Sequence, residues 1–188
     1  MLTNQKDGPF ERLEKGQIDL KAFAEDFEKF ARENNVTIDG SKFAEELNNV
    51  RIRPAFMEAV EQIKRKKVIV GVITNNWSTS FSHRMEELSK HFDFFIESYK
   101  VGMRKPQPEI YQLAQKKVEE LLGEKIDPSE LVFLDDLGVN LKSASKLGWN
   151  TIRVANPSIS LLILQNYLGI PLFTQESHSK YAKFNSNL

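Results

Sequence analysis

The chain has 188 residues and a formal net charge of zero, because 26 basic residues balance 26 acidic ones. This balance gives no electrostatic reason to expect a nucleic acid or an anionic membrane as a partner. The chain contains no cysteine, which excludes disulfides and thiolate metal sites, and its apolar runs are too short for a membrane span. We therefore expect a soluble, cytoplasmic protein with one domain, or with a core domain and a small lobe.

The first 50 residues predict a small all-helical lobe. Asp19 has the residue type of an N-cap, and apolar residues follow it at helical spacing as far as Ala31, so we expect a helix that ends near Asn34. A shorter helix is predicted over residues 41–48. Because this lobe is rich in phenylalanine, its aromatic side chains are expected to form a core and not a ligand pocket.

From Ile52 onward the pattern alternates between helix and strand, which predicts an α/β core with a mostly parallel sheet. Helices are expected over residues 54–67, 80–89, 108–122, 139–147 and 158–167. Strands are expected over residues 68–73, 93–97, 131–134 and 151–154, followed by a short edge strand over residues 170–173. The polar residues 174–188 have no apolar face and are expected to form a disordered tail.

Two adjacent carboxylates end the strand predicted over residues 131–134. Its four apolar residues indicate burial on both faces, and Asp135 and Asp136 follow directly. In open α/β sheets, ligands bind at this carboxyl end of the strands. Because neighbouring acids repel each other and are costly to desolvate, we expect a metal ion or a lysine beside them. The alternative is that one of the two acids caps the following helix.

Two further stretches carry polar residues that could form a site. Thr74, Asn75 and Asn76 follow the strand predicted over residues 68–73, where their side chains and backbone N–H groups could receive an anion or cap the next helix. Lys105 lies between a glycine turn and a Pro-x-Pro sequence, which holds its backbone rigidly. A lysine on such a platform is a stronger candidate for a binding site than a lysine on a flexible loop.

Three motifs resemble the second, third and fourth motifs of the haloacid dehalogenase (HAD)-like hydrolase superfamily, and they occur in the same order: Thr74–Asn75 after a strand, Gly102–Pro108, and Phe133–Asn140. Receiver domains also combine acids, threonine and lysine on a parallel sheet, but there the acid pair comes first. The stretches Arg12–Gly16 and His91–Ser98 are similar to the N-terminal phosphatase domain of soluble epoxide hydrolase.

The resemblance extends over residues 8–173 and implies a domain organisation and an activity. It implies a Rossmann-like core over residues 51–173 and a helical cap over residues 1–50, which would exclude water and select the substrate. The activity that it implies is Mg²⁺-dependent hydrolysis of phosphomonoesters through an aspartyl-phosphate. The cofactor is therefore expected to be Mg²⁺, and the substrate a phosphorylated small molecule or lipid.

The resemblance also implies a role for each matching residue. Asp136 would ligate Mg²⁺, and Asp135 would support the loop or a metal-bound water. Thr74 and Asn75 would hold phosphoryl oxygens, and Lys105 would neutralise the charge that the phosphate shares with the nucleophile. Lys105 and Asp135 are thus the expected catalytic residues.

One motif of the superfamily is missing from this sequence. In the family, the nucleophile is the first Asp of an Asp-x-Asp motif at the end of a buried strand that precedes the cap. Asp7 follows Leu2–Lys6, which has no buried-strand pattern, and is itself followed by Gly8 and Pro9. We therefore expect that the chain begins inside the cap insertion, that the central first strand is absent, and that the aspartyl-phosphate route is closed. Mg²⁺ affinity is then expected to be weak.

Two hypotheses of different classes remain. The chain is either a truncated HAD-like phosphatase that is inactive as given, or a non-catalytic module on the same scaffold that binds phosphate or another protein. A missing central strand would leave unpaired strand edges, so an oligomer or a strand-donating partner is also expected.

Overall fold

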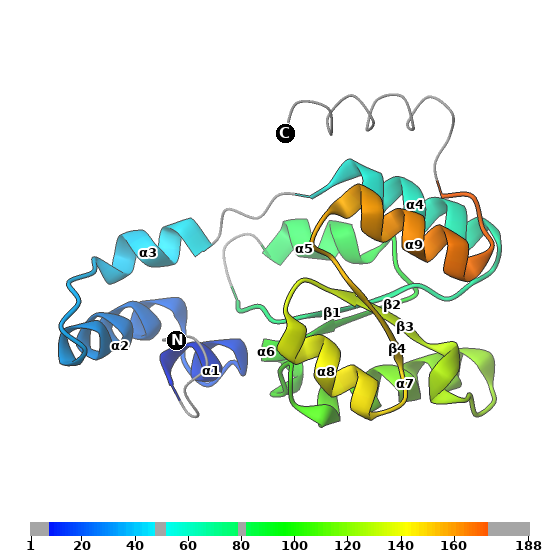
Figure 1. The fold of residues 1–188 in the computed structure, drawn as a ribbon. Helices are drawn as coiled ribbons and strands as arrows, with labels where there is room; N and C mark the ends of the chain where they lie inside the picture. The colour runs from blue at the N-terminus through cyan, green and yellow to red at the C-terminus, as the bar shows by residue number, and fades with distance from the viewer. Residues whose placement is uncertain (1–7, 48–51, 79–81, 173–188) are drawn as a thin grey trace, which may run out of the picture. The chain divides into compact units, whose positions relative to one another are not determined.

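The computed structural model describes residues 8–47, 52–78 and 82–172 (Figure 1). Its helices are α1 (Pro9–Glu14), α2 (Leu20–Glu33), α3 (Gly40–Leu47), α4 (Pro54–Arg65), α5 (Ser82–Ser89), α6 (Ser98–Val101), α7 (Pro108–Leu122), the 3-10 helix η2 (Pro128–Glu130), α8 (Gly138–Lys146) and α9 (Pro157–Leu168). Its strands are β1 (Gly71–Thr74), β2 (Phe94–Glu97), β3 (Val132–Asp135) and β4 (Asn150–Arg153). None of the helices in the described ranges has the length and the apolar composition that crossing a bilayer requires.

The four strands form two parallel pairs. β1 pairs with β2, with Gly71 opposite Phe94, and β3 pairs with β4, with Val132 opposite Asn150. A helix follows each strand along the chain, as parallel pairing requires a crossover connection. The predicted α/β fold with parallel strands is thus confirmed, although the short helices α6 and η2 were not predicted.

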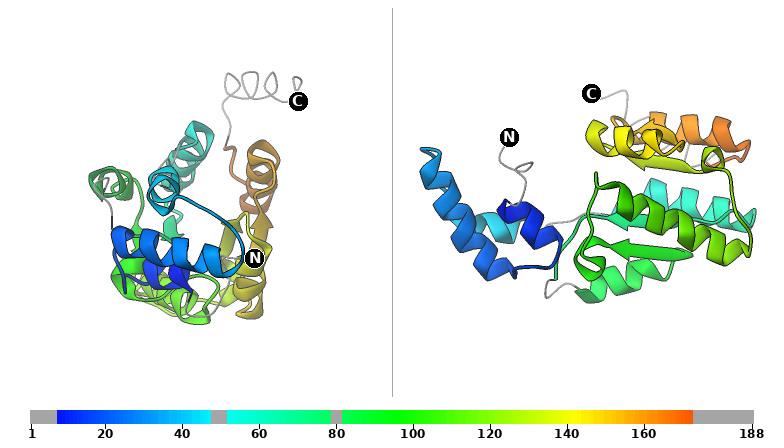
Figure 2. Two further views of the ribbon diagram at one scale, coloured as in Figure 1. Left: turned by 90° about the vertical axis from the view of Figure 1, so that its left-hand side faces the viewer. Right: turned by 90° about the horizontal axis from the view of Figure 1, so that it is seen from below.

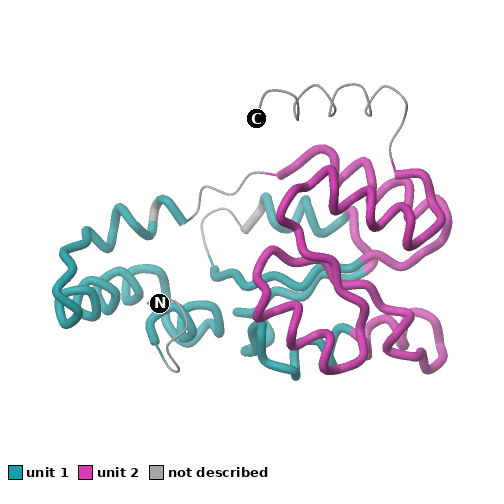
Figure 3. Tube along the Cα trace, in the orientation of Figure 1, with its two compact units in different colours: residues 1–51, 71–90, 94–114 teal, residues 52–70, 91–93, 115–188 magenta. Residues whose placement is uncertain are grey.

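The chain divides into two compact units, which Figure 3 shows in different colours. Unit 1 contains residues 1–51, 71–90 and 94–114, and unit 2 contains residues 52–70, 91–93 and 115–188. The helices of the first 50 residues therefore belong to the same unit as β1 and β2, while β3 and β4 belong to the other. Both units are built from segments that are far apart in the sequence.

An aromatic cluster holds α1, α2 and α3 together in unit 1. The rings of Phe10 and Phe23 meet edge-on with their centroids 4.9 Å apart, and the rings of Phe27 and Phe43 stack with their centroids 4.7 Å apart. Asp19 caps α2, since its side chain accepts a hydrogen bond of 2.8 Å from the first turn. α1 and α3 both pack against α2 (Figure 2). The predicted helices and their aromatic core are confirmed.

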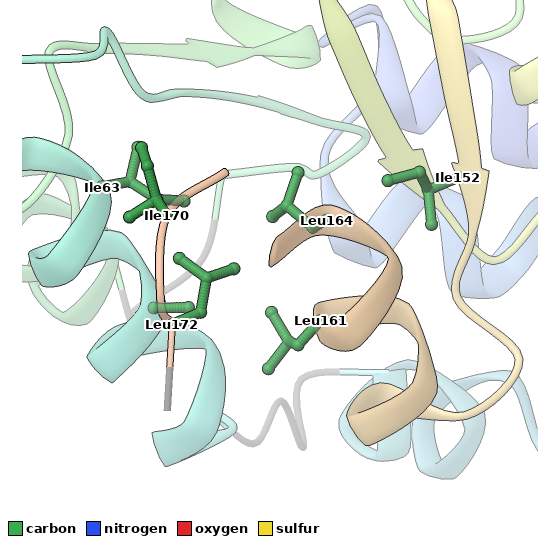
Figure 4. Packing of buried hydrophobic residues seen from close by; sticks show 7 residues of the cluster. Ile63, Ile152, Leu161, Leu164, Ile170 and Leu172 are labelled. Atoms are coloured by element: carbon green, nitrogen blue, oxygen red, sulfur yellow. The ribbon is translucent and has the colours of Figure 1, made fainter. Parts of the chain in front are cut away.

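The core of unit 2 consists of apolar side chains from α4, β4, α9 and the segment after α9 (Figure 4). Its buried members are Ala59, Ile63, Ile152, Leu161, Leu164, Ile170 and Leu172. The last two residues lie in the segment for which the sequence predicts an edge strand.

That prediction is wrong for its described part, residues 170–172, which form no strand. The side chains of Ile170 and Leu172 are buried in the core, and the N–H of Leu172 donates to the side chain of Gln165 (3.0 Å) instead of to a neighbouring strand. Apolar spacing indicates that side chains are buried, but it does not show that the backbone is paired. Residues 173–188, including the predicted tail, lie outside the described residues.

The strands are less buried than their apolar sequences predict. Val132, Phe133 and Leu134 of β3 are only half-buried, although we expected burial on both faces. β1 begins at Gly71 and not at Val68, and its side chains, those of Val72, Ile73 and Thr74, are half-buried. Within the described part of the chain, β1 and β3 each pair with one strand only. Full burial would require more neighbours than these residues provide.

Asp93 connects two loops of unit 2, the one before β2 and the one before β1. Its carboxylate accepts a hydrogen bond from the N–H of Val70 (2.8 Å) and forms an ion pair with Lys64 (3.0 Å). Burial acts to raise the pKa of Asp93, but the hydrogen bond from Val70 and the interaction with Lys64 outweigh this effect and lower the pKa below 3.8.

We expect Asp93→Ala to lower the free energy of unfolding by about 1 to 2 kcal/mol near neutral pH, because the N–H of Val70 loses its acceptor. Since folding lowers the pKa of Asp93, its ionic contribution is complete above the unfolded pKa and is lost as the pH falls through the folded pKa. Urea unfolding near neutral pH and well below pH 3.8 measures this difference. Asp19→Asn is the control, because Asn caps helices as well as Asp. A deficit that is equal at both pH values would contradict the ionic contribution.

Candidate functional site

One side chain joins the end of β1 to the loop before α7. The amide of Asn75 accepts a hydrogen bond from the N–H of Lys105 (2.9 Å) and donates one to the carbonyl of Lys105 (3.0 Å). Thr74, the last residue of β1, directly precedes Asn75. The structure thus brings together in unit 1 the three residues that the sequence analysis assigned to a phosphate site.

This geometry limits how Asn75 can meet a ligand. Its amide oxygen accepts from Lys105, while its amide nitrogen donates to Lys105 and to the carboxylate of Glu14 (3.3 Å). Both hydrogens of the amide nitrogen are therefore in use. The side chain of Asn75 therefore has no amide hydrogen left to donate to an anion.

A second link ties the loop after β1 to the end of β2. The N–H of Asn76 donates to the hydroxyl of Ser98 (2.9 Å), and this hydroxyl donates to the carbonyl of Asn76 (3.1 Å). The side-chain amide of Asn76 donates to Glu97 (2.9 Å). Because Ser98 and Glu97 are buried, these hydrogen bonds anchor the loop after β1 to the interior of unit 1. The side chain of Asn76 therefore has a structural partner within unit 1.

Glu14 of α1 completes the cluster, although the sequence analysis assigned it no role. Its carboxylate accepts the hydrogen bond from Asn75 and forms an ion pair with Nε of Arg104. Burial raises the pKa of Glu14 above its ordinary value, and the positive charges of Arg104 and Lys105 counteract this effect. The sequence signal for Glu14 was its place in the stretch Arg12–Gly16, which carried part of the family resemblance.

The acid pair lies at the end of β3 in unit 2, and its two members differ. Asp135 is buried, and its carboxylate accepts hydrogen bonds from the N–H of Leu137 (2.8 Å) and from the side chain of Asn140 (3.0 Å). Asp136 is exposed. Neither acid occupies the N-cap position of α8, which belongs to Leu137. Asp135 therefore holds the turn between β3 and α8, and Asp136 is the carboxylate that solvent reaches.

The described residues supply only part of a magnesium site. No group of three or more His, Cys, Asp or Glu side chains that could hold a metal ion occurs in the described ranges. Asp136 fits Mg²⁺ as a single oxygen ligand, because it is exposed and its neighbour Asp135 is occupied by the turn. Proteins often bind Mg²⁺ through one or two carboxylates together with waters and substrate phosphates. Asp136 would accordingly need such co-ligands.

Comparison with known sequences gives consistent matches. The family model described as haloacid dehalogenase-like hydrolase matches residues 16–154. Mouse bifunctional epoxide hydrolase 2 is 32% identical over 182 residues, which are 89% of this chain and 32% of that protein. Mouse acyl-CoA dehydrogenase family member 10 is 35% identical over 170 residues, which are 88% of this chain and 15% of that protein. The chain thus spans about a third or less of these curated relatives.

Comparison with solved structures agrees with the match to the family model. A HAD family enzyme from Bacteroides thetaiotaomicron, in complex with magnesium and inorganic phosphate, is 26% identical with a TM-score of 0.56. The similarity covers 79% of this chain and 75% of that chain.

Proposed function

Because the chain belongs to the haloacid dehalogenase-like hydrolase family, we propose that it carries the phosphate-binding part of a Mg²⁺-dependent phosphomonoester hydrolase. The substrate would be a phosphorylated small molecule or lipid. The helices of the first 50 residues would act as the cap, and residues 51–173 would belong to the family's Rossmann-like core.

The observation that carries this proposal is the pair of hydrogen bonds between Asn75 and the backbone of Lys105. Residues 75 and 105 are 30 positions apart in the sequence, so nothing local requires their contact. The contact keeps the threonine at the end of β1 close to the lysine of the loop before α7. A hydroxyl, backbone N–H groups and an ammonium are the donors that a phosphate requires.

The proposed roles follow from the charge of the phosphoryl group. Phosphoryl transfer depends mainly on cations and hydrogen-bond donors around the equatorial oxygens. Thr74 donates its hydroxyl and Asn75 its backbone N–H to phosphoryl oxygens. Lys105 neutralises negative charge on the phosphoryl group.

The acid pair contributes differently. Asp136 would hold Mg²⁺ as a single oxygen ligand, and the ion would supply the positive charge that phosphoryl transfer requires. Asp135 keeps this carboxylate in position through its hydrogen bonds to Leu137 and Asn140. The proposal is supported by the relative from Bacteroides thetaiotaomicron, which was crystallised with both magnesium and inorganic phosphate.

We expect Lys105→Met to weaken the binding of inorganic phosphate at least about tenfold, because the ammonium is lost while the apolar stem is kept. Calorimetric titration of the 188-residue chain with inorganic phosphate, in the presence of Mg²⁺, measures the affinity. The matched control is Lys116→Met, which removes an equal charge from a lysine whose side chain is 71% exposed on α7. The proposal fails if Lys105→Met binds phosphate as tightly as the unchanged chain.

A non-catalytic phosphate-binding or protein-interaction module is the second candidate. It is favoured by one property of the sequence: no two aspartates are separated by a single residue anywhere in the 188 positions. Phosphate binding that depends on Lys105, without turnover, would support this candidate.

A further inference from the structure

We infer that Glu14 is a positioning residue for Lys105, and that α1 is therefore part of the phosphate site. The inference rests on the proposed function, because it assigns Glu14 to the site in which Lys105 binds phosphate. Glu14 does not touch the phosphate. It acts through the two residues that hold the backbone of Lys105.

Glu14 contacts both of these residues. The first is Asn75, whose amide nitrogen donates to Glu14 (3.3 Å) and to the carbonyl of Lys105 (3.0 Å). The second is Arg104, which directly precedes Lys105 and forms an ion pair with Glu14. One carboxylate thus joins the loop after β1 to the loop before α7.

The carboxylate selects the orientation of the Asn75 amide. An ionised carboxylate accepts hydrogen bonds and donates none, so it favours the amide nitrogen over the amide oxygen. With the nitrogen towards Glu14, the amide oxygen faces the N–H of Lys105 (2.9 Å). The reversed amide would place its oxygen against the carboxylate of Glu14 and would lose both hydrogen bonds to Lys105.

The ion pair also fixes the turn that contains Lys105. The side chains of Glu14 and Arg104 are only 13% and 12% exposed, so solvent weakens their attraction little. The N–H of Arg104 donates to the side chain of Gln107 (3.1 Å), and the N–H of Gln107 donates to the carbonyl of Arg104 (2.8 Å). The ion pair between Glu14 and Arg104 therefore restrains the hydrogen-bonded turn from Arg104 to Gln107.

A purely electrostatic role for Glu14 and a positioning role predict opposite changes in phosphate affinity. A negative charge beside an anion site repels the anion, so neutralising Glu14 would then tighten phosphate binding. A positioning role predicts weaker binding, because Lys105 loses the contacts that orient it. The sign of the change therefore distinguishes the two roles.

The test compares two variants. Glu14→Gln keeps the length of the side chain and removes its charge, whereas Glu14→Asp keeps the charge and shortens the side chain by one methylene group. Titration of the 188-residue chain with inorganic phosphate should show affinity weakened roughly fivefold to tenfold in Glu14→Gln and also weakened in Glu14→Asp. Hydrogen exchange of the Lys105 amide, followed by NMR, should accelerate in both variants.

Glu28→Gln is the matched control. Glu28 also pairs with an arginine, Arg32 of the same helix α2 (3.5 Å), and it accepts a hydrogen bond from the N–H of Gly40 at the start of α3 (2.9 Å). We expect the phosphate affinity of Glu28→Gln to stay within about twofold of that of the unchanged chain. The exchange of the Lys105 amide serves as the readout if a Glu14 variant is too unstable for titration.

The outcomes separate the inference from the proposed function. If the unchanged chain binds no phosphate, or if Lys105→Met binds phosphate as tightly as the unchanged chain, the proposed function fails. The inference then fails with it. If Lys105→Met abolishes binding while Glu14→Gln binds as tightly as the unchanged chain, or more tightly, only the inference is overturned. Unchanged exchange of the Lys105 amide in both Glu14 variants would also overturn it.

Discussion

A polypeptide of residues 1–188 is expected to show no Mg²⁺-dependent turnover of an aryl phosphate above background. The family's covalent route needs a carboxylate nucleophile from an Asp-x-Asp motif, and the 188 residues contain no such motif. Removing the nucleophile of an enzyme that uses covalent catalysis costs at least about 10⁴-fold in rate. Binding groups such as Thr74 and Lys105 cannot replace the bond that the nucleophile forms.

The release of phosphate from an aryl ester measures this prediction. Fusing an N-terminal segment designed as a buried strand that ends in Asp-x-Asp should raise the rate by several orders of magnitude. The matched control carries Asn-x-Asn in the same segment, and it should stay at background. Turnover by residues 1–188 alone that disappears in Asp136→Ala would contradict the prediction. Another residue would then serve as nucleophile, and Asp7, which lies outside the described residues, would be tested first.

The second large effect concerns stability. In the strand order that the family resemblance implies, the strand that bears the nucleophile lies between the strands that correspond to β1 and β3. Within the described residues, β1 pairs only with β2 and β3 only with β4, and the apolar residues of β3 are half-buried. Each unpaired buried backbone group costs about 1 to 3 kcal/mol, and a whole strand of them rivals the ~5 to 15 kcal/mol stability of a domain. We therefore expect residues 1–188 alone to be marginally stable and prone to associate through these edges.

Chemical unfolding and light scattering test this expectation. The same N-terminal strand should raise the midpoint of unfolding and suppress association, whether or not it carries the aspartates. A segment of equal length with a proline in the middle of the strand is the control, because proline cannot donate to a ladder. A cooperative transition of monomeric residues 1–188 with a high midpoint would refute the prediction.

Periodicity along the chain was sufficient to predict most of the elements. Asp19 caps its helix, and the parallel strands alternate with helices as expected. These features depend on a residue and its near neighbours in the sequence. Local chemistry determines caps and turns, and spacing determines which face of an element is apolar.

The sequence by itself also determined which residues were candidates for a phosphate site, because Thr74, Asn75 and Lys105 each follow a recognisable pattern. Only the tertiary structure decided how they are used. In the folded chain, the side chain of Asn75 is hydrogen-bonded to the backbone of Lys105. It is also hydrogen-bonded to Glu14, which lies 61 residues before Asn75 in the sequence. The tertiary structure also buries Leu172 without pairing it in a strand. Contacts between distant segments depend on how whole elements pack, and periodicity within one element carries no record of that packing.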